Sequence, residues 1–222
     1  MYAKRRSTLK KMIAALSVIL VLLVGVAGSL AYLQVKTGSV QNTFAPSNID
    51  LTLAETATEG GSTTANTYKM IPGVKIDKDP KVTVKADIDC YVFVEVTETD
   101  NFDTYMTYAI ASGWKLLNTN TGEETEITDK TELNGTFVLV REVSADVAKD
   151  GKVFDVLAGN QVMVPNTVTK DDMDRLYNND GTVKADAELP KLTFTAYAIQ
   201  KAGFEDNLAG AWAKAQGQVS GS

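Results

Sequence analysis

The chain has 222 residues, with 22 Lys and Arg against 28 Asp and Glu, a single cysteine and no histidine. One cysteine excludes an intramolecular disulfide, and the missing histidine excludes Ser-His-Asp triads, Cys–His pairs and HExxH zinc sites. The first 31 residues hold five basic residues and no acid, so the remainder carries 17 basic against 28 acidic residues, a net charge of −11. That charge opposes binding to nucleic acid or anionic lipid, because both need a basic face.

The chain begins with the features of a secretory leader. Basic residues between Lys4 and Lys11 precede an apolar run from Met12 to Ala27, and small residues follow. This order is typical of a signal peptide, and a retained membrane anchor is the alternative because the run is about long enough to span a bilayer. We predict a signal peptide over residues 1–31 and a protein that works outside the membrane. The expected cleavage region comprises Ser29, Leu30, Ala31 and Tyr32.

Alternation of apolar and polar residues predicts a series of β-strands. The strongest pattern is Cys90–Val96, whose β-branched and aromatic residues favour a central strand that is buried on one face and partly covered on the other. Cys90 lies in this run, so we interpret it as a small buried hydrophobic residue and not as a reactive thiol. The predicted strands cover residues 49–53, 81–86, 90–96, 114–117, 136–143, 151–157, 161–164 and 191–200.

Turn signals separate several of these strands. Pro72-Gly73 predicts a tight turn, with proline at its second position and glycine free to take a positive φ at its third. Asn134-Gly135 is a typical hairpin signal immediately before the predicted strand 136–143. The segment Glu55–Thr67 is rich in Thr, Gly, Ser and Ala, and we predict a flexible loop there.

Two short helices complete the expected elements. Thr169, followed three residues later by Asp172, predicts a capped helix start. Asp206 or Asn207 is expected to cap a final helix over 208–215, which Trp212 would anchor. Short alternating strands without a βαβ rhythm indicate a single domain that is mainly β, an antiparallel β-sandwich with two short helices. The boundaries are an N-terminal arm over 32–48, the sandwich over 49–215 and a flexible tail over 216–222.

Five segments in a fixed order resemble a known family. They are Asn42-Thr43-Phe44, Ile49–Leu53, Ile71-Pro72-Gly73, Tyr91–Val96 and Leu192–Gln200. Behind this leader, the order resembles the TasA/camelysin family of proteins that Gram-positive bacteria secrete, whose leaders are cut by the dedicated signal peptidase SipW. The resemblance covers residues 4–96 and 191–213, and the middle of the chain shows far less of it.

The resemblance implies a jelly-roll fold at the cell surface, where relatives assemble into biofilm-matrix fibres. In those fibres an N-terminal segment of one subunit completes the sheet of the next, through backbone hydrogen bonds and alternate side chains. Residues 32–44 occupy the corresponding place, and the expected partners are further copies of the chain or other matrix subunits. The alternative is an edge strand folded back on its own domain, or a disordered arm. The candidate donor-strand contacts are Leu33, Val35, Val40 and Phe44.

Camelysin has been regarded as a metalloprotease, so the resemblance carries an enzymatic alternative. Without histidine only an all-carboxylate site is possible, and such a site favours hard cations over catalytic zinc. We therefore predict no enzyme, no cofactor and no metal site. The acidic cluster of Asp171, Asp172 and Asp174 with Asp180 does not follow EF-hand spacing, and acids at a helix start complement the helix dipole.

A monomeric surface module that binds carbohydrate or protein is the second alternative. Trp114, Tyr105 and Tyr108 could line a sugar-binding face by aromatic stacking. Aromatic residues in β-proteins more often belong to the core, and we predict that role for all three.

Overall fold

The computed structural model describes residues 34–36, 49–58, 61–129 and 133–217. All of these described residues belong to one compact unit. The predicted leader lies outside the described residues, together with its cleavage region at 29–32. No helix in the described ranges is long and apolar enough to cross a membrane.

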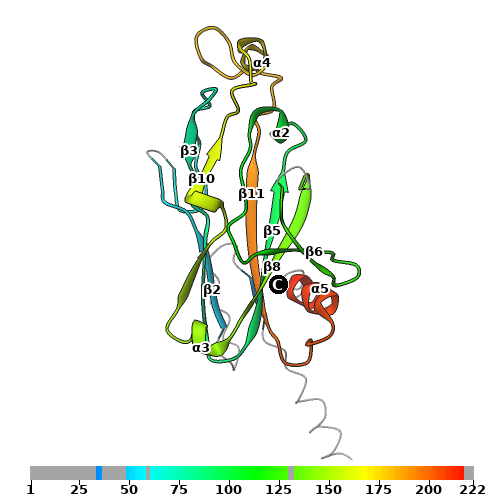
Figure 1. Cartoon of the computed structure of the whole chain (residues 1–222). Helices are drawn as coiled ribbons and strands as arrows, with labels where there is room; N and C mark the ends of the chain where they lie inside the picture. Colours follow the sequence, from blue (N-terminus) through cyan, green and yellow to red (C-terminus); the bar gives the residue numbers. More distant parts are fainter. Residues whose placement is uncertain (1–33, 37–48, 59–60, 130–132, 218–222) are drawn as a thin grey trace, which may run out of the picture. The chain divides into compact units, whose positions relative to one another are not determined.

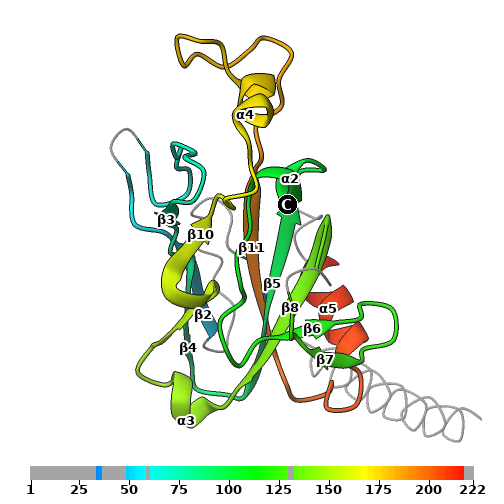
Figure 2. The ribbon, with the colours of Figure 1, turned by 45° about the horizontal axis from the view of Figure 1, so that its top comes forward.

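The fold is mainly β, and the strands pair antiparallel in three sheets (Figures 1 and 2). The main sheet has six strands in the order β1-β11-β5-β8-β6-β7, and the smaller sheets have the orders β2-β4-β9 and β10-β3. The strands are β1 Gln34–Lys36, β2 Ile49–Ala54, β3 Lys75–Asp77, β4 Lys81–Ala86, β5 Cys90–Glu98, β6 Lys115–Leu117, β7 Glu124–Glu126, β8 Thr136–Val143, β9 Lys152–Asp155, β10 Gln161–Met163 and β11 Leu192–Gln200.

The helices are short except the last. They are α2 Phe102–Tyr105, α3 Ala145–Ala148, α4 Lys170–Leu176 and α5 Leu208–Gly217, with a 3-10 turn, η2, at Ala158–Asn160. The two predicted helices are present as α4 and α5. Helix α2 lies within residues 102–111, for which the sequence left a short helix or a loop open, and α3 was not predicted. The final helix also runs two residues further than predicted, into the segment expected to be a flexible tail.

Strand β5 is central because both of its faces are covered. Val92 and Val94 on one face and Phe93 on the other are all fully buried. Its neighbours are β11, in the register Val94–Ala196, and β8, in the register Val94–Leu139. The period-two pattern over 90–96 predicted this strand correctly, including the cover on its second face.

The first face of β5 contributes to a hydrophobic cluster that the main sheet shares with the three-stranded sheet. The main sheet supplies residues of β5, β8 and β11, and the other sheet supplies residues of β2 and β4. Apolar side chains from the inner faces of two sheets interdigitate, and this packing holds one sheet against the other. The members from β2 and β4 are Ile49, Leu51, Val82, Val84 and Ala86.

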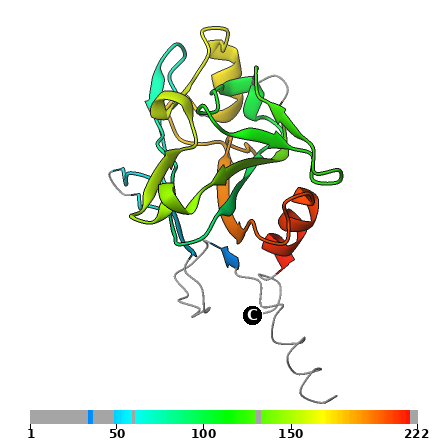
Figure 3. The same cartoon turned by 60° about the horizontal axis from the view of Figure 1, so that its bottom comes forward.

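Helix α5 covers the second face of the main sheet (Figure 3). The Trp212 ring lies 5.4 Å from the Phe93 ring and 5.1 Å from the Tyr197 ring, and its side chain is only 5% exposed. The side-chain oxygen of Asn207 accepts a hydrogen bond of 2.9 Å from the Gly210 backbone N–H, which makes Asn207 the helix cap. The predicted anchor and one of the two predicted caps are confirmed.

Two local predictions are confirmed at the level of hydrogen bonds. Thr169 and Asp172 form a reciprocal capping box at the start of α4. At the Pro72-Gly73 turn, the Val74 N–H donates to the Ile71 carbonyl over 3.0 Å, and Gly73 has φ = +80°. A positive φ at the third position identifies a type II turn, which needs glycine there.

One other prediction, the hairpin at Asn134-Gly135, is wrong. Asn134-Gly135 precedes β8, but β8 pairs with β5 and β6, and the preceding strand β7 pairs with β6 instead. Gly135 does take a positive φ of 64°, so the dipeptide set the local backbone but not the partner strand. The described residues of the segment 55–67 form no helix or strand, as predicted for a loop. They are joined by hydrogen bonds, including two donated by Thr58 to the Asn66 side chain.

Candidate functional site: the open edge of the main sheet

The N-terminal arm contributes an edge strand to the main sheet of its own domain. In this pairing Gln34 faces Ile199, Val35 faces Ala198 and Lys36 faces Tyr197. Val35 is the one candidate donor-strand contact in the described ranges, and Leu33, Val40 and Phe44 lie outside them. For residues 34–36 the structure therefore shows the folded-back edge strand that the sequence left as an alternative.

The direction of each backbone group on β11 follows from the bonds at the two ends of its pairing with β5. The Thr99 N–H donates to the Lys191 carbonyl over 3.2 Å, and the Lys201 N–H donates to the Asp89 carbonyl over 2.8 Å. In an antiparallel pair both groups of a residue point to the same side, and the side alternates along the strand. Odd-numbered residues of β11 therefore bond to β5, and even-numbered residues point toward β1.

This alternation defines which residues of the arm carry the pairing. Val35 stands opposite Ala198, an even-numbered residue, so the two exchange both of their backbone hydrogen bonds. Gln34 and Lys36 stand opposite odd-numbered residues and direct their backbone groups away from β11. The described part of the arm is thus held by a single hydrogen-bonded residue pair, which contributes about 1–3 kcal/mol at the usual net value of two hydrogen bonds.

Strand β11 continues beyond the end of β1. Leu192 and Phe194 point their N–H and C=O groups toward the same edge, and no residue in the described ranges bonds to these groups there. We call this stretch the open edge of β11. Unpaired backbone groups along a sheet edge are a template for an additional strand.

The opposite edge of the main sheet is built differently. It is formed by β7, which has only three residues, all exposed. Glu124 and Glu126 lie 3.3 and 3.8 Å from the Lys115 ammonium. A short edge strand that carries charges resists pairing with another chain, so the two edges of the sheet are not equivalent.

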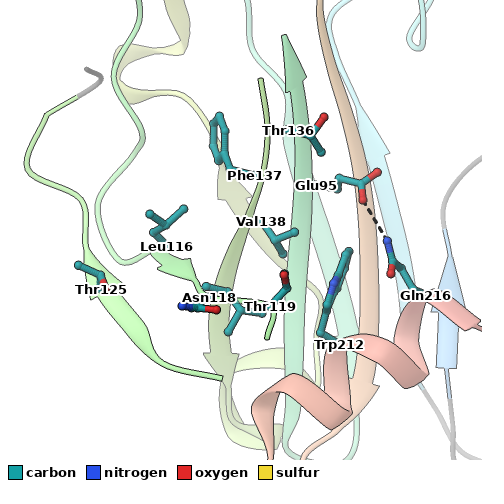
Figure 4. Close-up of a pocket in the computed structure, with 11 residues that line it drawn as sticks. Glu95, Leu116, Asn118, Thr119, Thr125, Thr136, Phe137, Val138, Trp212 and Gln216 are labelled. Carbon is teal, nitrogen blue, oxygen red and sulfur yellow. Dashed lines mark hydrogen bonds between the residues drawn. The ribbon is translucent and has the colours of Figure 1, made fainter. Parts of the chain in front are cut away.

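A groove of about 550 Å³ lies where α5 crosses the main sheet (Figure 4). Its walls combine hydroxyl, amide and aliphatic groups, and the Gln216 side chain donates a hydrogen bond of 3.2 Å to Glu95. The Trp212 ring is occupied by its contacts with Phe93 and Tyr197, so it does not offer a free stacking face. The lining residues are Glu95, Leu116, Leu117, Asn118, Thr119, Thr125, Thr136, Phe137, Val138, Trp212 and Gln216.

The aromatic residues considered for a sugar-binding face are in the core. Trp114, Tyr105 and Tyr108 are 2%, 4% and 6% exposed. The Trp114 indole N–H donates to the Asp155 carbonyl over 2.8 Å, and Tyr108 donates to the buried carboxylate of Glu98. Across the described ranges, every aromatic side chain is buried or half-buried. The core assignment of all three residues is confirmed.

The groups considered for chemistry have structural partners. Cys90 is fully buried, and burial, reinforced by the charge of Asp89, raises the pKa of its thiol to about 12. Asp172 belongs to the capping box, Asp174 pairs with Lys170, and Asp180 accepts a hydrogen bond of 3.0 Å from the Thr182 N–H. Among the residues that the structure describes, no group of three or more Cys, Asp or Glu could hold a metal ion.

Comparisons of the chain with protein-family models, with curated proteins and with solved structures found no match. The resemblance to the TasA/camelysin family therefore rests on the five sequence segments alone.

Sequence reasoning missed the open edge of β11. Alternation located the strand correctly, but it carries no information on which neighbour covers each edge.

Proposed function

We propose that the protein is a secreted structural protein of the cell surface or biofilm matrix that assembles into fibres by strand addition. The N-terminal arm of one copy would replace β1 on the β11 edge of the next copy. The observation that carries the proposal is the pairing of Val35 with Ala198 beside Leu192 and Phe194, whose outward backbone groups have no partner among the described residues. The acceptor surface and the donor segment thus already match in backbone register.

In the single chain β1 lies against β11, α5 and β2, and exchange between copies must replace these contacts. The described arm is held by one hydrogen-bonded residue pair, and residues 37–48 connect it to β2. Twelve residues span up to about 40 Å when extended, which is enough to carry the arm to a neighbour without disturbing β2. Because the donor and acceptor are different surfaces, the contact is head-to-tail, and it gives an open polymer when the rotation between copies does not close a ring.

An incoming strand can bond to more of β11 than β1 does. In the same register, Ser39 and Gln41 would stand opposite Phe194 and Leu192. Val40 differs from Val35 by an odd number of positions, so the two valines would fall on opposite faces of an extended strand. Val35 would then lie on the same face of the sheet as Ala198, and Val40 would lie on the opposite face.

We further infer that the main and three-stranded sheets form a jelly-roll β-sandwich, which the hydrophobic cluster common to both sheets supports. The proposed role is non-enzymatic, and the burial of Cys90 and the structural partners of the acidic residues support it. Export through the leader and processing by a SipW-type peptidase belong to the same proposal.

Sedimentation of two purified forms tests the proposal, one starting at Tyr32 and one at Ile49, over a series of concentrations. We expect only the longer form to grow into large species, and thermal unfolding of both forms shows whether each is folded. A peptide of residues 32–48 added to the shorter form should bind it. If the longer form stays monomeric at every concentration, strand addition is wrong.

That result would favour a monomeric binding module. The groove beside α5 supports this second candidate, because Glu95, Gln216 and Asn118 offer hydrogen-bonding groups to a polar ligand.

A further inference from the structure

A partly buried ion pair links the segment after β2 to the segment after β3. The Lys78 ammonium lies 2.7 Å from Oε1 of Glu55, and their side chains are only 11% and 14% exposed. Tyr68 donates a hydrogen bond of 3.3 Å to the other oxygen of the same carboxylate. An ion pair that is largely shielded from water is costly unless further hydrogen bonds satisfy both partners.

A carboxamide completes this site. The side-chain nitrogen of Asn66 lies 3.4 Å from Oε2 of Glu55, so the one carboxylate bridges the Lys78 amine and the Asn66 amide. The Asn66 side-chain oxygen accepts two hydrogen bonds, from the N–H of Thr58 at 2.9 Å and from its hydroxyl at 3.0 Å. A Cβ at Gly61 would lie 2.2 Å from that oxygen, so only glycine leaves it this space.

Two aromatic rings flank the amine. The Lys78 nitrogen lies 5.5 Å from the centre of the Tyr68 ring and 5.4 Å from that of Phe194. Burial, followed by the charge of Glu55, raises the pKa of Tyr68 to about 12, so the phenol remains a hydrogen-bond donor to Glu55. The site therefore combines an amine, an acid that can carry a proton, and a carboxamide whose oxygen is held by two donors.

We propose that Lys78 and Asn66 form an intramolecular amide cross-link, with Glu55 as the proton carrier. One proton passes from the Lys78 ammonium to Glu55, and the neutral amine attacks the Asn66 side-chain carbonyl carbon. Negative charge that develops on the Asn66 oxygen is stabilised by the two Thr58 donors, as in an oxyanion hole. The new C–N bond forms, the old one to the amide nitrogen breaks, and ammonia leaves after receiving a proton from the Lys78 nitrogen.

Glu55 ends the reaction in the protonation state in which it began. It gives the proton it carried to the departing ammonia, so an ammonium ion is released and Glu55 is again a carboxylate. No oxidant, reductant or metal is needed. The single cysteine denies this chain an intramolecular disulfide, and the amide would supply a covalent link across residues 66–78.

A neighbouring ion pair provides a matched control. Lys81 lies 2.7 Å from Asp79, the same distance as in the Lys78–Glu55 pair, but its side chain is 40% exposed. The other oxygen of Asp79 accepts a hydrogen bond from the Thr56 N–H, and in the described ranges no carboxamide donates a hydrogen bond to Asp79. The proposal therefore predicts a cross-link at Lys78 and none at Lys81.

Intact-mass measurement of the purified full chain, followed by peptide mapping, tests the proposal. We expect a mass lower by one ammonia and a branched peptide that joins Lys78 to Asn66. K78R, E55Q and N66A should each restore the full mass, whereas K81R should keep the loss. Circular dichroism of each variant establishes that its fold is retained.

Two results would overturn the proposal. One is a folded wild-type chain with the full calculated mass after prolonged incubation at neutral pH. The other is a loss of ammonia that persists in N66A and maps to Asn134-Gly135, where a backbone succinimide would produce the same mass change. Neither result bears on strand addition, because sedimentation measures that separately.

Discussion

Replacing Val35 by proline tests the backbone pairing of the arm most directly. Val35 is the hydrogen-bonded partner of Ala198, and proline has no N–H to donate. The substitution removes one bond and leaves the Ala198 carbonyl unpaired. The neighbouring position supplies the control, because Gln34 directs its N–H away from β11, and proline is tolerated at such edge positions.

The magnitude follows from the number of bonds. Loss of the one hydrogen bond that Val35 donates to Ala198 costs about 0.5–1.5 kcal/mol for each contact between copies, which corresponds to a contact roughly 2–13-fold weaker. We therefore expect the concentration at which half of the chain starting at Tyr32 sediments as large species to rise by that factor in V35P. In Q34P it should stay close to the wild-type value.

The folded domain itself serves as an internal reference. The described core is built from residues of β2, β4, β5 and β8, so both variants should keep the secondary structure of the wild type by circular dichroism. If V35P and Q34P assemble equally well, the assignment of hydrogen-bonded positions on β11 is wrong. If Q34P alone blocks assembly, the register is shifted by one residue.

Three further outcomes are expected. W212A should lower the free energy of unfolding by about 3–5 kcal/mol in urea titrations, and the exposed V147A by less than about 0.5 kcal/mol; equal effects would show that α5 does not depend on Trp212. Burial raises the pKa of Asp79, but hydrogen bonds from Lys81 and Thr56 outweigh it and lower this pKa to about 2. Because the folded pKa is depressed, its stabilisation is complete above about pH 4 and is lost as the pH falls toward 2. Between about pH 4 and pH 2 the free energy of unfolding of D79N should therefore fall less steeply than that of the wild type. Parallel curves would contradict the assignment. Cys90 should react with a thiol reagent at pH 8 only after unfolding, because burial raises its pKa to about 12, and rapid labelling of the folded chain would show that the strand opens.

Local sequence patterns determined most of the elements. Alternation gave β4 and β8 their observed bounds and placed β5 and β11 within two residues, because side chains alternate between faces within a single strand. Thr169 with Asp172 and Pro72-Gly73 were equally readable, since a helix cap and a tight turn depend on residues a few positions apart. The sequence therefore determined which faces are buried and where the chain turns.

The tertiary structure decided which elements become neighbours. Val35 pairs with Ala198, which is far away in the sequence, and Asn134-Gly135 set a turn without choosing the partner of β8. Glu55 and Lys78 flank a segment that composition alone assigned to a flexible loop, and their contact depends on the packing of β2 and β3. Alternation records burial but not the identity of the covering strand, so the open edge and the cross-link site could not be read from the chain alone.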